Sequence, residues 1–255
     1  MMNSEMEKVL IYNDEGVDRE CFNETLRSIN RSSIAEQVQV EAVNGTALNS
    51  TSWEERCLVF VVPGGRSTPY YELMRQSGMQ RVCDYVSSGG AYLGLCAGGY
   101  FGCSRTEFEL GGPLEIVRND GLGFLAGKAT GPAINAGEFC YESYAGSELT
   151  VVTLHDLPHD RVRLYYCGGA GFHPADSDEV EVLARYEECE DSPIAILKGI
   201  YGKGRFILSG IHFEVSHTSL PRDDEHIRSF YAELERQEET RQQVFDHLLE
   251  GLVDR

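Results

Sequence analysis

The amino-acid sequence predicts an α/β fold with a mostly parallel sheet. Short apolar segments at residues 8–12, 38–43 and 57–62 are typical of buried strands, and apolar residues at helical spacing follow the first and third of them. Strands that alternate with helices form parallel sheets covered on both faces. We therefore expect a flavodoxin-like, three-layer α/β domain.

The first half of the chain supplies the elements of that sheet. Asp18 is placed to cap a helix that contains Cys21, and residues 44–55 read as a polar loop. A second helix is expected over residues 71–86. A short apolar strand that includes residues 91–93 follows it.

The pattern changes after about residue 110, where short strand candidates alternate with glycine-rich turns, as in antiparallel sheets. The candidates are Leu114–Val117, Phe139–Tyr144, Thr150–Thr153, Val162–Tyr166, Val180–Tyr186 and Pro193–Lys198. We expect them to extend the sheet, with a hairpin turn at 202–204 before a last strand.

The end of the chain reads as helical over residues 222–253, and its polar stretch 235–243 is either a break or a solvated face. No Pro/Ser-rich linker or block of charge divides the sequence. We expect one domain over residues 1–255, with its core in residues 8–216.

Composition narrows the function classes. The 255-residue chain has 41 acidic residues against 22 Lys and Arg, a net charge of −19, which argues against nucleic acid or an anionic membrane as a partner. The first eight residues contain no apolar signal region, and the eight cysteines form no C-x-x-C pair. Free thiols in the cytoplasm are the expectation.

The segment Gly94-Leu95-Cys96-Ala97-Gly98 directly after a strand is the cysteine form of the nucleophile elbow. Such a turn holds its central side chain in a strained, open position, and flanking glycines avoid a collision of Cβ atoms with the backbone. The helix that follows favours a thiolate at Cys96, and its N–H groups, beginning with that of Ala97, can bind an oxyanion. A buried packing cysteine is the alternative.

His212-Phe213-Glu214 follows the last predicted strand. If that strand continues, His212 and Glu214 share a face. A carboxylate beside an imidazole fixes its tautomer, as a general base requires. A solvated histidine at a strand end is the alternative.

Gly64-Gly65, at the carboxyl end of the third strand, can line a loop with N–H donors. Such a loop would supply the second half of an oxyanion hole. An ordinary turn is the alternative.

No metal or cofactor site is predicted. The histidines at 155, 159, 173 and 217 have no ligand spacing to nearby cysteines, and Gly202-Lys203-Gly204 is no complete phosphate loop.

The elbow at Cys96 with a distant His-x-Glu resembles the class I glutamine amidotransferase-like superfamily. Within it, the chain is similar to the amidotransferase-like N-terminal domain of eukaryotic biotin–protein ligases and its stand-alone relatives. The segments that carry this resemblance are Val62-Pro63-Gly64-Gly65, Gly94 to Tyr100, Gly131-Pro132-Ala133, Tyr165-Tyr166-Cys167-Gly168-Gly169, and Ser209 to Glu214. The resemblance implies Cys96 as nucleophile, His212 as base and Glu214 as its orienter, with N–H groups of Gly65 and Ala97 as the oxyanion hole.

The sequence also departs from that superfamily. Tyr100 stands where glutamine amidotransferases usually have a Gln that binds the substrate, and Phe213 where Pro is frequent. No biotin-ligase catalytic segment is present, so we expect no ligation of biotin by this chain itself.

We expect a cysteine-dependent amidase or hydrolase that acts through an acyl thioester on a small-molecule acyl or amide substrate other than glutamine. The residues expected around the substrate are Gly64, Tyr100, Tyr165, Tyr166, Gly168 and Gly169. A biotinyl amide or ester is one candidate, although these tyrosines also suit a core. The alternative function is a non-catalytic binding or regulatory module, for which a protein partner is conceivable. A third alternative, a redox or glyoxalase-type function, is the least favoured of these, because Ala97 stands where such proteins usually have a His directly after the Cys.

Overall fold

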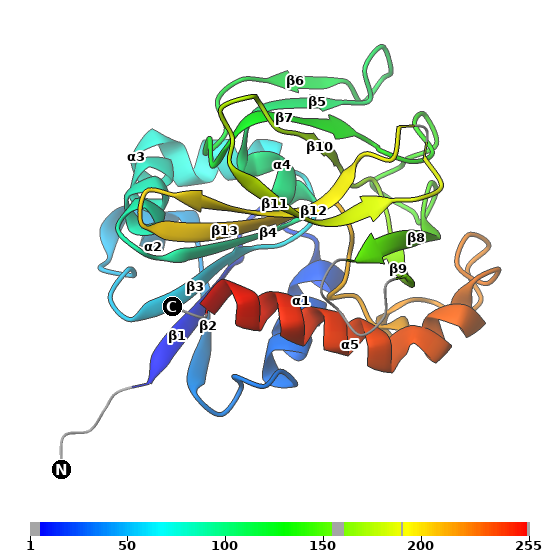
Figure 1. The fold of residues 1–255 in the computed structure, drawn as a ribbon, viewed down its shortest axis with the longest axis horizontal. Coiled ribbons are helices and arrows are strands. Elements are labelled where there is room, and N and C mark those ends of the chain that lie inside the picture. Colours follow the sequence, from blue (N-terminus) through cyan, green and yellow to red (C-terminus); the bar gives the residue numbers. More distant parts are fainter. Residues whose placement is uncertain (1–5, 155–160, 190, 254–255) are drawn as a thin grey trace.

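Five parallel strands form the centre of the molecule (Figure 1). The computed structural model describes residues 6–154, 161–189 and 191–253, so His155 and His159 lie outside the described residues. The central strands are β1 (Glu7–Tyr12), β2 (Val38–Val43), β3 (Cys57–Val62), β4 (Ala91–Leu95) and β13 (Gly204–Ser209). Their spatial order β2-β1-β3-β4-β13 is the flavodoxin-like order, so the predicted fold class is confirmed.

Helices cover both faces of this sheet and make three layers (Figure 1). On one face lie α2 (Gly45–Ser50), α3 (Thr68–Ser87) and α4 (Ala97–Phe101), and on the other lie α1 (Arg19–Asn30) and α5 (Tyr231–Val253). Each face of the sheet carries a hydrophobic core, and successive strand residues point to opposite faces. Phe60 packs on the first face, and Val59 and Val61 pack on the second. Strands β1, β3, β4 and β13 are therefore buried on both sides over most of their length, as their apolar sequences predict, whereas the edge strand β2 is partly exposed.

The antiparallel extension begins at β12 (Ile194–Tyr201), which pairs with β13 through the hairpin predicted at 202–204. The sheet continues from β12 in two directions. One branch contains β10 (Gly171–His173), β7 (Leu125–Gly131), β5 (Cys103–Phe108) and β6 (Ile116–Arg118), and the other contains β11 (Val180–Tyr186), β8 (Glu148–Leu154) and β9 (Arg161–Tyr166). Strands β5, β7 and β10 have polar or glycine-containing sequences and were not predicted. The pair β5–β7 is parallel, unlike the antiparallel extension that we expected.

Three predicted elements differ in the structure. Residues 139–144 are not a strand, because Phe139 and Tyr141 pack against Phe108 in an aromatic cluster instead of pairing. The expected loop 44–55 contains α2, which buries Leu48.

At the C-terminus, residues 222–230 form turns, and the helix begins at Tyr231. The polar stretch 235–243 is neither a break nor wholly solvated, because α5 runs through it and buries Arg241 and Gln242. Among the described helices, none combines the length and the apolar character needed to cross a membrane.

Candidate active site

Cys96 occupies a strained turn between β4 and α4. Its backbone has φ 48° and ψ −104°, a combination that non-glycine residues rarely adopt. The Cys96 N–H donates to the Ser209 carbonyl at 2.8 Å, which ties the turn to the end of β13. A Cβ atom on Gly98 would lie 2.0 Å from the Val62 carbonyl oxygen, and one on Gly94 would lie 2.4 Å from the Gly98 carbonyl oxygen. The turn therefore requires both glycines.

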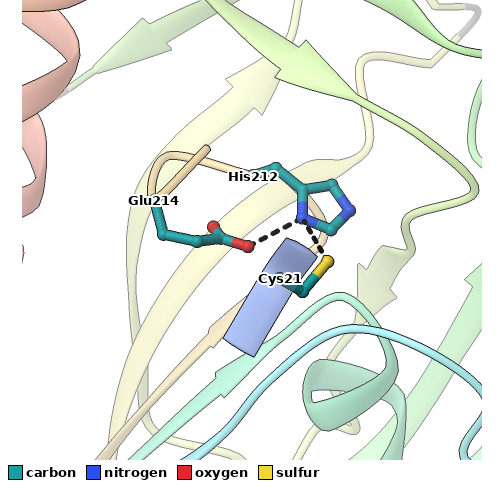
Figure 2. A group of neighbouring side chains, drawn as sticks. All are labelled: Cys21, His212 and Glu214. Atoms are coloured by element: carbon teal, nitrogen blue, oxygen red, sulfur yellow. Dashed lines mark hydrogen bonds and ion pairs between the residues drawn. The ribbon is translucent and has the colours of Figure 1, made fainter. Parts of the chain in front are cut away.

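His212 and Glu214 lie in a turn beyond β13, and not on a continued strand as the sequence suggested. The strand ends at Ser209, and the His212 N–H then donates to the Tyr165 carbonyl at 3.0 Å. Within the turn, His212 Nδ1 lies 2.8 Å from Glu214 Oε1 (Figure 2). The bond to Glu214 leaves Nε2 of the imidazole available.

Cys96 and His212 both lie next to Gly64. A Cβ atom on Gly64 would lie 3.0 Å from His212 Cε1 and 3.4 Å from Cys96 Cβ. Glycine at this position leaves room for both side chains. The Cys96 Sγ atom itself is directed to the Cys167 carbonyl, 3.6 Å away. The described structure holds no hydrogen bond between Cys96 and His212.

The loop Gly64–Gly65 is held against the start of α1. The Asp18 N–H donates to the Gly64 carbonyl at 3.0 Å, and the Arg66 N–H donates to the Gly16 carbonyl at 2.7 Å. The described chain offers no acceptor to the N–H of Gly65. The Ala97 N–H is the first of α4 and has no acceptor within the helix. Both residues line cavities next to Cys96.

Burial and charge act in opposite directions on His212, whose side chain is almost entirely buried. Burial lowers the pKa of the imidazole, but the carboxylate of Glu214, together with Cys96 and Cys21, raises it, and the net pKa lies well above the usual value. The site therefore favours a protonated His212 held by Glu214.

Two further thiols, of Cys21 and Cys167, lie near His212. Burial raises the pKa of Cys21 well above its usual range, although His212 lowers it, and burial raises the pKa of Cys167 to about 11. Both thiols therefore stay protonated at neutral pH.

Arg241, on α5, holds the turn that carries His212 and Glu214. Its side chain is 3% exposed, and its Nη1 donates to the carbonyls of Phe213 at 2.9 Å and Glu214 at 3.3 Å. Ser28 Oγ, from α1, donates to the same Glu214 carbonyl at 3.0 Å. Helices from both ends of the chain thus fix one turn. The polar sequence around Arg241 gave no signal of this role.

Two cavities adjoin Cys96. The larger, of about 440 Å³, is lined by Cys96 and His212 together with Tyr165, and acidic residues such as Glu142 also line it. The smaller, of about 30 Å³, lies between Cys96 and Tyr100.

The residues predicted around the substrate are distributed unevenly about these cavities. Tyr165 lines the larger, and Gly168 and Tyr100 line the smaller. Tyr166 and Gly169 line neither, because the Tyr166 hydroxyl turns to the carbonyl of Gly169 at 3.0 Å. Gly64 lines neither cavity but lies next to both Cys96 and His212.

Cys21 is a site residue that the sequence did not single out. Its Sγ atom lies 3.9 Å from His212 Nδ1 (Figure 2), although the two residues are 191 positions apart. Its backbone N–H donates to Asp18, the N-cap of α1, at 2.9 Å. Together with His212 and Glu214 it forms a group of ligand types that bind metal ions.

Comparison with known proteins assigns the chain to a family. The family model described as "Biotin-protein ligase, N terminal" matches residues 7–253. The chain belongs to this family.

Two proteins are similar to this member of the biotin–protein ligase N-terminal family. An uncharacterized protein of Chlamydia muridarum is 38% identical over 212 residues, which cover 82% of this chain and 81% of that protein. A biotin–protein ligase of Schizosaccharomyces pombe is 30% identical over 249 residues, which cover 96% of this chain. The chain spans 37% of the length of that ligase.

Solved structures with low sequence identity share the fold alone. A cytoplasmic protein of Salmonella typhimurium LT2 has a TM-score of 0.56 at 13% identity, with coverage of 97% of this chain and 99% of that one. A β-galactosidase of Rahnella sp. R3 has a TM-score of 0.52 at 14% identity, with coverage of 84% and 30%.

Replacement of Arg241 is expected to destabilise the fold. In Arg241→Lys, one ammonium cannot reach the carbonyls of Phe213 and Glu214 while it also pairs with Glu238. We expect the free energy of unfolding, measured in urea, to fall by about 2 kcal/mol. The control is Arg236→Lys on the same helix, where the exposed ion pair with Glu233 predicts a change within about 0.5 kcal/mol. Equal effects of the two substitutions would contradict this role.

The charge on His212 is expected to depend on Glu214. Because its folded pKa is raised, the imidazole should remain protonated at pH 7. The stability that this pair contributes is fully present below the unfolded pKa of about 6.5 and is lost as pH rises through the folded pKa. Glu214→Gln should lower the His212 pKa in an NMR titration.

His173 is the internal control for this titration, because it is not bonded to Glu214. Burial and Lys128 lower the pKa of His173, and Glu214→Gln should leave that pKa unchanged. A His212 pKa that is the same in both proteins would show that Glu214 does not hold the charge.

Proposed function

We propose that this chain is a cysteine-dependent amidase or hydrolase that works through an acyl thioester. The observation that carries the proposal is the strained turn at Cys96, which lies beside a buried His212–Glu214 pair. Strain of this kind persists where the surrounding structure enforces it, and it clusters at active sites. The resemblance to class I glutamine amidotransferase-like proteins supports the same residues.

The first half of the reaction forms the thioester. In the reactive form Nε2 of His212 carries the proton of the Cys96 thiol, so that thiolate and imidazolium form an ion pair, which the raised pKa of His212 favours. Glu214 stabilises this imidazolium through Nδ1. The thiolate attacks the carbonyl carbon of the substrate, and the N–H groups of Gly65 and Ala97 stabilise the oxyanion. As the C–N or C–O bond breaks, the His212 imidazolium gives its proton to the leaving amine or alcohol.

Water completes the cycle. It enters from the larger cavity, loses a proton to the now neutral His212 and attacks the thioester carbonyl. The acid product leaves, and the proton returns to Cys96. For this cycle the Cys96 side chain rotates from the Cys167 carbonyl towards His212, about its first side-chain torsion.

The pocket supports a substrate other than glutamine. Tyr100, which replaces the usual Gln, is 4% exposed, and its hydroxyl donates to the Gly168 carbonyl at 3.1 Å. Its ring is packed edge-on against Phe108. Tyr100 therefore fills this side of Cys96. The larger cavity, lined by Tyr144 and Tyr165, suits a flat or apolar acyl group such as a biotinyl amide or ester.

We further propose that the chain works in the cytoplasm on a small molecule, without binding nucleic acid or a membrane. Its charge of −19 and its free cysteines support this setting.

A second candidate is a non-catalytic module of the biotin–protein ligase family. Cys96 is only 8% exposed, and its thiol is bonded to a carbonyl rather than to His212. This arrangement favours a role for Cys96 in packing or ligand capture.

Intact-mass spectrometry separates the two candidates. The protein is incubated with a panel of activated acyl donors, biotinyl esters among them, and with glutamine. We expect a mass increase of one acyl group in the wild type, none in Cys96→Ala, and absent or very slow release of ammonia from glutamine. Tyr100→Gln alone should not restore glutamine hydrolysis, because the rest of the pocket differs.

The acylated residue is identified by peptide mapping, and Cys140→Ala, which changes another cysteine of the same cavity, is the control. No adduct from any donor would favour the non-catalytic module. Efficient hydrolysis of glutamine would overturn the argument from Tyr100.

A further inference from the structure

Cys21, His212 and Glu214 form a compact group of three different ligand types (Figure 2). Their ligand atoms all lie within 4.8 Å of one another. A thiol, an imidazole and a carboxylate are the ligands that Zn²⁺ takes in proteins, whereas Mg²⁺ and Ca²⁺ take oxygen ligands. The ligand set therefore favours zinc.

The distances allow an ion to enter with small side-chain movements. Ligand atoms bound to zinc at their usual lengths of about 2.0–2.3 Å lie roughly 3.3–3.6 Å apart in a tetrahedron. Here Nδ1 of His212 is 2.8 Å from Glu214 Oε1 and 3.9 Å from Cys21 Sγ. The first pair opens by about half an ångström and the second closes by about a third of one. The third pair, Cys21 Sγ and Glu214, closes from within 4.8 Å.

Glu214 supplies an independent indication of a missing partner. Its side chain is completely buried, and its Oε2 atom has no hydrogen-bond partner among the described residues. A buried carboxylate oxygen without a partner is costly. An ion bound between the three side chains would give this carboxylate the additional partner that it lacks.

We propose that Cys21, His212 and Glu214 bind one Zn²⁺ ion, with His212 coordinating through Nδ1. The ion replaces the proton that His212 and Glu214 share, and the thiol proton of Cys21 is released to solvent. The larger cavity next to Cys96, which Cys21 and His212 line, gives the ion access and room for a water as the fourth ligand.

Zinc at this site would switch off the proposed reaction. A neutral imidazole that binds a metal through Nδ1 carries its proton on Nε2. His212 then cannot accept the proton of Cys96. This inhibitory effect rests on the proposed function, whereas the binding of zinc does not.

The test uses the reduced full-length protein, with Zn²⁺ affinity measured by competition with a chromophoric chelator and Co²⁺ as a spectroscopic probe. We expect one ion per chain and a thiolate-to-cobalt charge-transfer band. Because loss of even an outer-shell partner of a metal costs 10–100-fold in affinity, Cys21→Ser should weaken zinc binding by at least about a hundredfold and abolish the band. Glu214→Gln should also weaken binding.

Two cysteines of the same cavity, Cys96 and Cys140, provide the matched controls, because Cys96→Ser and Cys140→Ser should keep the band. In the wild type, Zn²⁺ should also protect Cys21 from alkylation, a measurement that needs no variant. Absence of zinc binding, or a band lost in Cys96→Ser and kept in Cys21→Ser, would overturn the proposal. Neither result depends on whether the protein hydrolyses any substrate.

Discussion

The hydrogen bond between His212 Nδ1 and Glu214 Oε1 decides what this site can do. It is buried, so water does not screen it, and it raises the pKa of the imidazole against the effect of burial. Because the bond uses Nδ1, it leaves Nε2 of His212 for other partners. The proposed catalysis needs this bond intact, whereas the proposed zinc site replaces its proton.

The rest of the fold holds this pair opposite Cys96. Strand β13 brings the chain to Ser209, whose carbonyl also receives the N–H of Cys96. Arg241 and Ser28 then bond the turn from the opposite face of the sheet. The C-terminal helix α5 therefore contributes to the site through Arg241, although its own side chains do not line the cavities next to Cys96.

The sequence predicted the parallel half of the sheet because most of its strands are continuous apolar segments buried on two faces, and the partly exposed edge strand β2 still shows its valines at 38, 40 and 43. It predicted less of the antiparallel half, where partly exposed strands such as β7 contain glycine and lysine. Local sequence also predicted the elbow. Gly94 is required by its contact with Gly98, and Gly98 by its contact with Val62 of the adjacent strand β3.

The sequence could not predict contacts between distant segments. Cys21 approaches His212 only because α1 packs beside the last turn, and the position of Arg241 on the buried side of α5 depends on the whole sheet. The directions of Tyr165 and Tyr166 follow from the pairing of β9 with β8. Their common Tyr-Tyr-x-Gly-Gly sequence does not distinguish the residue that lines the cavity from the one that does not.

The central claim is that the His212–Glu214 pair serves Cys96. The rate of alkylation of Cys96 by iodoacetamide at pH 7, followed by peptide mass spectrometry, tests it most directly. Since a nearby imidazolium favours the reactive thiolate, His212→Ala should slow this reaction by about tenfold or more, while alkylation of Cys140 stays unchanged. A Cys96 rate that is the same in both proteins would contradict the claim.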